Sequence, residues 1–376
     1  MPKQLKTYLI QLILFLATVI TSSFAGGELI GLPVESYGAL LKLGLWFSIP
    51  FLGILTIHEF GHYITAKIYK VKATLPYYIP FIGIIGTLGA FIRLQSMPRN
   101  RKQFFDIGIA GPLAGFVAAI GILIFGFTHL PPADYIYKIH NEYRQYGADY
   151  GKYVYQNPSD SVVVLAVGGN LLFNAMEKVL VKDKSRIPND YEMMHYPLLF
   201  AGYLALFFTA LNLFPIGQLD GGHILYGLVG VKKHKIISTI FYTFLVTIGG
   251  IGIFTSPVFG DFVPLGTFEN FILFVPIYLG VLYFAFFARI TKSVVTNFLI
   301  TVLVFVAQYI IAEILPNTGG FIGYMFFAFI IGRLLGLGHP KSGREESIGL
   351  GRKILGWFAF VVLILCFSFQ PIYILH

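Results

Sequence analysis

The amino-acid sequence predicts an all-α, polytopic membrane protein with about nine transmembrane helices. Hydrophobic residues make up 56% of the 376 residues and charged residues only 12%, whereas a soluble domain carries roughly 25% charged residues. The hydrophobic residues gather in runs long enough to cross a bilayer as helices, for which about 20 residues suffice. The basic residues occupy alternate loops between these runs, which is the pattern of loops on the cytoplasmic side of a membrane.

The candidate spans are nine hydrophobic runs, at residues 8–25, 39–69, 104–129, 196–230, 236–256, 271–288, 295–315, 319–335 and 354–374. With nine spans, the short Lys- and Arg-rich loops face one side together with Lys3 and Lys6, whereas the long insert at 131–195 is of mixed charge. The intervening segments 26–38 and 257–270 contain acidic residues and no base. The charge pattern therefore predicts a cytoplasmic N-terminus and an outer C-terminus.

The net charge of +9 is explained by these loops. No basic stripe on a soluble fold indicates nucleic-acid binding, so the expected surroundings are a lipid bilayer. No feature indicates an oligomeric state. The first run, 8–25, ends at Ser23-Phe24-Ala25, which is similar to a signal-peptide cleavage site. We favour an uncleaved signal anchor, because the run has 18 residues and the rest of the chain is polytopic.

The second run contains the motif His58-Glu59-Phe60-Gly61-His62. Residues four apart share one face of a helix, so both imidazoles can bind one Zn²⁺ while Glu59 acts on a bound water. Ionisable residues inside an apolar span are costly, which favours a functional interpretation over a pair of histidines at a helix end. The single cysteine, Cys366, excludes a cysteine-rich zinc site.

Residues 75–94 are apolar but contain two prolines and several glycines, so a helix is not expected there. A short hairpin or a re-entrant segment fits better, and at membrane depth either must be buried in protein or line a wet cavity. The third run opens with Gly108, Gly111, Pro112 and Gly115. Small residues at this spacing let helices approach closely, and packing against the metal helices is the interpretation we favour.

A zinc site of this kind needs a third protein ligand. The only carboxylate of the fourth run is Asp220, and Pro215, Gly217, Gly221 and Gly222 beside it can loosen the helix and let it turn toward the metal. The second and fourth runs cross in the same direction, and both motifs lie in the inner half of their runs. We therefore expect His58, His62 and Asp220 to meet at similar depth, toward the cytoplasmic half of the membrane.

Two further polar residues lie close to Asp220 in the sequence. His223 is a weaker candidate for a ligand or a supporting group, and an interfacial position explains it better. Asn212 can hydrogen-bond a substrate backbone or an oxyanion, or else bond between helices as buried asparagines do. The two readings of Asn212 are equally supported.

The chain divides into three parts by composition. Residues 1–38 form an N-terminal anchor and outer loop, and residues 39–230 form a core with a polar, Tyr-rich outer insert at 131–195. Within this insert, 161–181 is expected to form an apolar or amphipathic helix on the outer surface, because a tenth span there would invert all the later charge asymmetry. Residues 231–376 contain further spans that carry no assignable motif.

These motifs together resemble the site-2 protease family of intramembrane zinc metalloproteases. The resemblance rests on His58-Glu59-Phe60-Gly61-His62, on Ala110-Gly111-Pro112-Leu113-Ala114-Gly115, and on Asn212 through Gly222, which has the form N-x-x-P-x-x-x-L-D-G. It covers roughly residues 40–230. The Gly-Thr-Leu-Gly-Ala stretch at 86–90 is most like the bacterial and plastid-type branch without a PDZ domain, and 131–195 is too short for a full PDZ fold.

The resemblance implies one Zn²⁺ per chain, held by His58, His62 and Asp220, with Glu59 as the catalytic base. It also implies a three-helix core with a β-hairpin and cleavage of transmembrane protein substrates, in regulated intramembrane proteolysis. The expected location is a bacterial inner membrane.

Two other functions fit parts of the sequence. A prenyl-protein protease would use a downstream glutamate ligand, but Glu177 lies in the outer insert and disfavours it. A metal or proton-coupled transporter could use the same His and Asp cluster. Hydrolysis of a transmembrane peptide distinguishes a protease from such a transporter.

Overall fold

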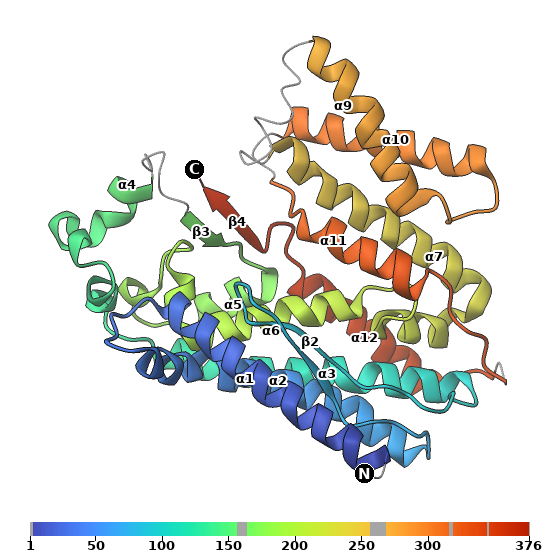
Figure 1. Ribbon diagram of the computed structural model, residues 1–376, viewed down its shortest axis with the longest axis horizontal. Coiled ribbons are helices and arrows are strands. Elements are labelled where there is room, and N and C mark those ends of the chain that lie inside the picture. The colour runs from blue at the N-terminus through green and yellow to red at the C-terminus, as the bar shows by residue number, and fades with distance from the viewer. Residues whose placement is uncertain (1–2, 156–163, 256–267, 316–318, 344–345, 376) are drawn as a thin grey trace.

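The chain forms a bundle of apolar helices with two small sheets (Figure 1). The computed structural model describes residues 3–155, 164–255, 268–315, 319–343 and 346–375. Every predicted run is mainly helical where it is described, because a helix satisfies its own backbone hydrogen bonds in lipid. The long helices are α1 (Lys3–Ile30), α2 (Tyr37–Ile68), α3 (Arg101–Thr128), α6 (Pro197–Leu213), α7 (Asp220–Thr255), α9 (Phe268–Val281), α10 (Val294–Ile314), α11 (Gly323–Ile330) and α12 (Leu350–Cys366). Helices α9 and α11 continue as π-helical turns at Leu282–Phe287 and Ile331–Leu335.

Among the described residues, five helices are long and apolar enough to cross a membrane by themselves: α1, α2, α3, α7 and α10. The apolar helices Pro197–Leu213, Ile272–Phe287 and Gly323–Leu335 are shorter, and α12 has 17 residues. The chain is therefore an integral membrane protein by its helices, while the count of nine spans stays a prediction.

The fourth predicted run is not one continuous helix. Helix α6 ends at Leu213, and α7 begins only at Asp220. The connection between them contains Pro215 and Gly217, whose φ of 55° is one that glycine adopts readily. Helix α7 then extends past residue 230, where Gly230 interrupts it with φ 76° and ψ 173°, and reaches Thr255 through the lysines that separate the fourth and fifth runs.

The segment 75–94 forms the hairpin rather than a re-entrant turn. Strand β1 (Tyr77–Pro80) pairs antiparallel with β2 (Thr87–Phe91), with Tyr78 opposite Ala90. Helix α1 fixes this hairpin through two side chains. Gln11 Nε2 donates to the carbonyl of Leu75 at 2.7 Å, and Thr21 Oγ1 donates to the carbonyl of Gly86 at 2.6 Å.

The polar insert consists mainly of short helical segments and loops. It contains η1 (Ala133–Lys138), η2 (Asn141–Asp149), α4 (Tyr150–Tyr155), β3 (Val164–Val167), α5 (Leu171–Leu180), η3 (Lys184–Arg186) and η4 (Met193–His195). The predicted helix at 161–181 is wrong at 164–167, because β3 pairs antiparallel with β4 (Ile372–Leu375). The last run is likewise helical only to Cys366. Residues 161–163 lie outside the described residues.

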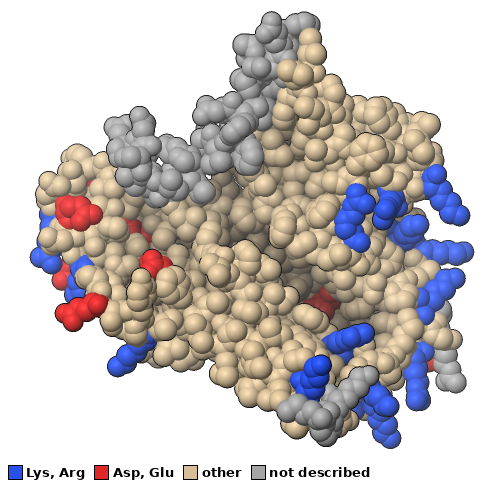
Figure 2. Space-filling model, in the orientation of Figure 1, with Lys and Arg blue, Asp and Glu red and all other residues tan. Residues whose placement is uncertain are grey.

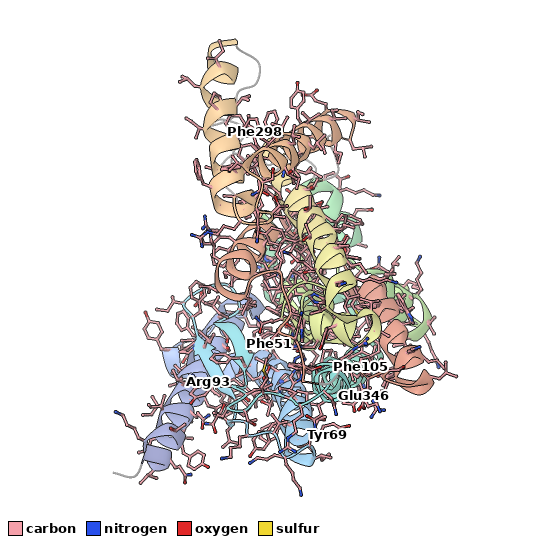
Figure 3. The ribbon with its side chains drawn as sticks, turned by 90° about the vertical axis from the view of Figure 1, so that its right-hand side faces the viewer. Phe51, Tyr69, Arg93, Phe105, Phe298 and Glu346 are labelled. Carbon is pink, nitrogen blue, oxygen red and sulfur yellow. The ribbon has the colours of Figure 1, made fainter. Side chains whose placement is uncertain are left out.

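Helix α6 lies at the centre of the core. It packs against α2, α3, α7 and α12, and 13 of its 17 residues are buried. Figure 3 shows Phe51 and Phe105 within the packed bundle, whereas Phe298 lies on α10 at the upper end of the molecule. The core surrounds the connection between α6 and α7, which positions Asp220.

Candidate metal centre and active site

Helix α2 presents His58, Glu59 and His62 to the interior of the bundle. Each of these residues is 5–6% exposed. His58 and His62 are one helical turn apart, so their rings lie on one face, and their Nε2 atoms are 3.1 Å from each other. The intervening Glu59 has its Oε1 atom 3.9 Å from His58 Nε2. The predicted motif thus forms one compact polar group.

The glycines of α3 make room for both histidine rings. A Cβ on Gly111 would lie 2.2 Å from His62 Nε2, and one on Gly115 would lie 3.1 Å from His58 Cβ. On the α2 side, a Cβ on Gly61 would lie 2.6 Å from the carbonyl oxygen of Ala110. The small residues of the third run therefore pack against the metal helix, as the sequence predicts.

A backbone carbonyl of α3 orients one imidazole. His62 Nδ1 is 2.6 Å from the carbonyl oxygen of Ile107. Because a carbonyl can only accept, Nδ1 carries the hydrogen and Nε2 keeps its lone pair. This is the arrangement by which metal-binding histidines are usually held.

Asp220 completes the group from the first residue of α7. Its Oδ2 atom is 3.3 Å from His58 Nε2 and 3.2 Å from His62 Nε2. Tetrahedral Zn²⁺ with bonds of 2.0–2.2 Å separates its ligand atoms by about 3.3 Å. The three separations, 3.1, 3.2 and 3.3 Å, fit a single zinc ion with a fourth position left for water.

These residues line one cavity of about 370 Å³ between α2, α3, α7 and the hairpin. Ala90 and Phe91 of β2 and the following Ile92 form part of its wall. Asn212, near the end of α6, lines the same cavity. Its side-chain amide makes no hydrogen bond to another residue of the described chain. The structure thus brings together His58, Glu59, His62, Asp220 and Asn212, and the weaker candidate His223 lines the same cavity.

His223 is directed toward another histidine. Its Nδ1 is 2.7 Å from Nε2 of His339, and its ring stacks on Phe104. Burial lowers the pKa of His339 to about 3, so this side chain is neutral at pH 7. Sequence reasoning missed His339, because a single histidine in a polar loop over a hundred residues away gives no local signal.

Comparison with known proteins gives a consistent set of relatives. Residues 46–255 match peptidase family M50. The chain is 30% identical to "Probable zinc metalloprotease EGY1, chloroplastic" of Oryza sativa subsp. japonica over 61% of this chain and 39% of that protein. The EGY1 protein of Arabidopsis thaliana is 30% identical over 61% of this chain and 41% of its own length.

The protein named "Probable zinc metalloprotease EGY2, chloroplastic" of Oryza sativa subsp. indica is 29% identical, over 59% of this chain and 34% of its length. The chain therefore spans well under half of the length of these curated relatives. No solved structure matches it. The matched region contains every residue of the candidate metal centre.

Proposed function

Because the chain belongs to peptidase family M50, we propose that it is an intramembrane zinc endopeptidase that cuts membrane proteins within or near their transmembrane segments. The observation that carries this proposal is the triangle of His58 Nε2, His62 Nε2 and Asp220 Oδ2, with sides of 3.1–3.3 Å, beside a buried Glu59. In this proposal the three side chains hold one Zn²⁺ per chain.

Zinc held by His58, His62 and Asp220 would supply a water of lowered pKa and would polarise a scissile carbonyl. Glu59 accepts the water's proton on its carboxylate and later delivers it to the leaving amine. The carbonyl of Ile107 keeps the proton of His62 on Nδ1, so that Nε2 remains free to bind metal. Asn212, which lines the same cavity, donates from its side-chain amide to the developing oxyanion.

The substrate backbone must be extended, since a helical peptide bond is shielded by its neighbours. Strand β2 pairs with β1 along one edge in a two-stranded sheet, and Ala90 and Phe91 of this strand reach the cavity that holds Glu59. We infer that an unwound substrate segment adds to β2 as a further strand. Main-chain pairing of this kind would place a peptide bond beside the metal without requiring a fixed side-chain sequence.

The orientation in the membrane is part of the proposal. Figure 2 shows most of the visible Lys and Arg side chains at one end of the molecule, and most of the visible acidic side chains at the other, where a few basic side chains also lie. This asymmetry and the positive-inside rule support a cytoplasmic position for the basic end, in a bacterial-type membrane. The N-terminus would be cytoplasmic, the insert and the C-terminus outside, and the active site in the cytoplasmic half.

Glu59→Gln tests the chemistry directly. The amide keeps the shape of the side chain but cannot accept a proton, so cleavage of a reporter transmembrane peptide in liposomes should fall by about 100- to 10,000-fold. Zinc content, measured by elemental analysis, should stay at the parent level. Parental turnover in a zinc-loaded Glu59→Gln protein would refute the mechanism, and a parent that cuts no such peptide would favour a transporter.

A further inference from the structure

A second cluster of metal-binding residues lies in the polar insert, on elements that take no part in the candidate active site. His140 directly precedes η2, while Glu192 and His195 flank and end η4, which leads into α6. The Nε2 atoms of the two histidines are 3.4 Å apart. Glu192 Oε2 is 3.2 Å from His195 Nε2 and 3.9 Å from His140 Nε2.

The Nδ1 atom of each imidazole lies next to a hydrogen-bond acceptor, which orients the ring. His195 Nδ1 lies 2.8 Å from the carbonyl oxygen of Leu29 and 3.1 Å from that of Ile30, at the end of α1. Since these carbonyls only accept, His195 carries its hydrogen on Nδ1 and directs the lone pair of Nε2 into the cluster. His140 Nδ1 faces the Glu142 carboxylate at 3.3 Å in the same way. Such partners are typical of histidines that bind a metal.

Glu192 is the third member of the cluster and is 1% exposed. Its Oε1 accepts a hydrogen bond from the hydroxyl of Tyr155. Its Oε2 accepts none within the part of the chain that the structure describes, although His195 Nε2 is close. A carboxylate oxygen is rarely buried without a compensating partner. A cation between this oxygen and the two nitrogen lone pairs would compensate all three.

We propose that His140, Glu192 and His195 form a second binding site for a divalent transition metal, with Zn²⁺ as its preferred occupant. Two imidazoles and one carboxylate suit zinc, whereas magnesium and calcium prefer oxygen ligands alone. The separations of 3.2 and 3.4 Å match the roughly 3.3 Å between ligands of tetrahedral zinc. The third separation, 3.9 Å, involves His140, whose side chain is 29% exposed and can adjust.

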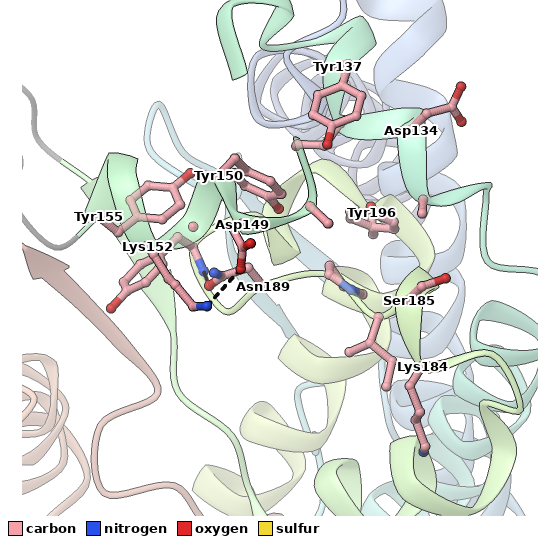
Figure 4. A pocket seen from close by; sticks show the side chains of 17 residues that line it. Asp134, Tyr137, Asp149, Tyr150, Lys152, Tyr155, Lys184, Ser185, Asn189 and Tyr196 are labelled. Atoms are coloured by element: carbon pink, nitrogen blue, oxygen red, sulfur yellow. Dashed lines mark hydrogen bonds and ion pairs between the residues drawn. The ribbon is translucent and has the colours of Figure 1, made fainter. Parts of the chain in front are cut away.

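The bound metal would join three segments that are distant in the sequence. It would connect the loop before η2 to the start of α6, and through His195 to the end of α1. Tyr155, on the other oxygen of Glu192, also lines a cavity of about 800 Å³ with Tyr137, Tyr150 and Tyr196 (Figure 4). The site would therefore stabilise the contact between the loop before η2 and η4, and with it the wall of the tyrosine-rich cavity that contains Tyr155.

This site can be studied separately by measuring the metal content of a variant that lacks the histidines of the candidate active site. The full chain with His58→Ala and His62→Ala is purified in detergent, stripped with a chelator and reloaded with Zn²⁺ or Co²⁺. We expect one metal per chain by elemental analysis, together with the visible absorption of tetrahedral Co²⁺. Adding His140→Ala should weaken this binding by at least about 100-fold, and Glu142→Gln, which alters a supporting partner, by about 10- to 100-fold.

His129→Ala is the matched control, because His129 is an exposed histidine at the end of α3 and should leave metal binding unchanged. A folded, monodisperse background protein that binds no metal would overturn the proposal. So would Co²⁺ absorption and affinity that His140→Ala leaves unchanged. None of these measurements depends on proteolysis, so failure of the proposed function and failure of this site are separable.

Discussion

Glycines position the histidines of the candidate active site. His62 is held between the carbonyl of Ile107 and the bare α-carbon of Gly111, and Gly115 faces His58 in the same way. The two helices can approach so closely only because these positions carry no side chain. The positions of the two histidine rings therefore depend on Gly111 and Gly115, which have no side chain.

Gly111→Ala is expected to disrupt the metal centre. Its methyl group would lie 2.2 Å from His62 Nε2, so the ring must move, and a misplacement of about 1 Å can reduce catalysis about 100-fold. Zinc content and peptide cleavage should both fall. Gly121→Ala on the same helix is the control, because its methyl group meets nothing within 4 Å. A Gly111→Ala protein with parental zinc and turnover would contradict this account.

In the proposed function, the hairpin β1–β2 is the element that connects the metal centre to a substrate. It is held to α1 by Gln11 and Thr21 and to α2 by a 2.7 Å hydrogen bond between Thr56 and Tyr78. Gly89 gives β2 its local shape, with φ of 106°, a conformation that other residues avoid. These three bonds fix the hairpin to α1 and α2, while β2 lines the cavity.

Gly89→Ala should reduce cleavage without releasing zinc. The added methyl group has open space around it, so the effect is backbone strain of about 1–3 kcal/mol that bends β2 away from its present path. Turnover of the transmembrane reporter, with zinc measured in parallel, tests this. Gly147→Ala carries comparable strain at a φ of 55° in the insert and should leave turnover unchanged. Equal losses in both variants would mean that β2 has no particular role.

The whole molecule is polarised along its long axis. Basic side chains gather at one end (Figure 2), while β4 at the C-terminus pairs with β3 of the insert at the other (Figure 1). The pairing requires the insert and the C-terminus to be on the same side of the membrane. The charge asymmetry predicts the same side, which is the outside.

Cysteine labelling tests this orientation in intact cells. With buried Cys366 replaced by alanine, cysteines are introduced singly in place of Lys152 and Lys341, both of which are exposed. A membrane-impermeant maleimide should label position 152 and not position 341, and detergent should make both reactive. Labelling of both positions, or of neither, before detergent is added would refute the proposed orientation.

Local patterns in the sequence predicted the helices, the hairpin region and five of the residues that line the cavity. Hydrophobic runs and an i, i+4 histidine pair are visible in a short window, and Asp220 was the only acid in its run. The strand pairing of 164–167, the contact of His339 and the approach of His140 to His195 could not be predicted this way. Each of these three contacts joins segments far apart in the chain. A pattern within a short window of sequence cannot predict such contacts.

The pairing of β3 with β4 also constrains how the protein is made. The two strands are separated by more than half of the chain, and closing so long a loop is entropically unfavourable and slow. The insert emerges from the ribosome long before residues 372–375, so β3 has no partner until these residues have been translated. During that interval its edge is a free template for chaperones or for aggregation. Chains that stop before residue 372 would therefore leave the edge of β3 unpaired.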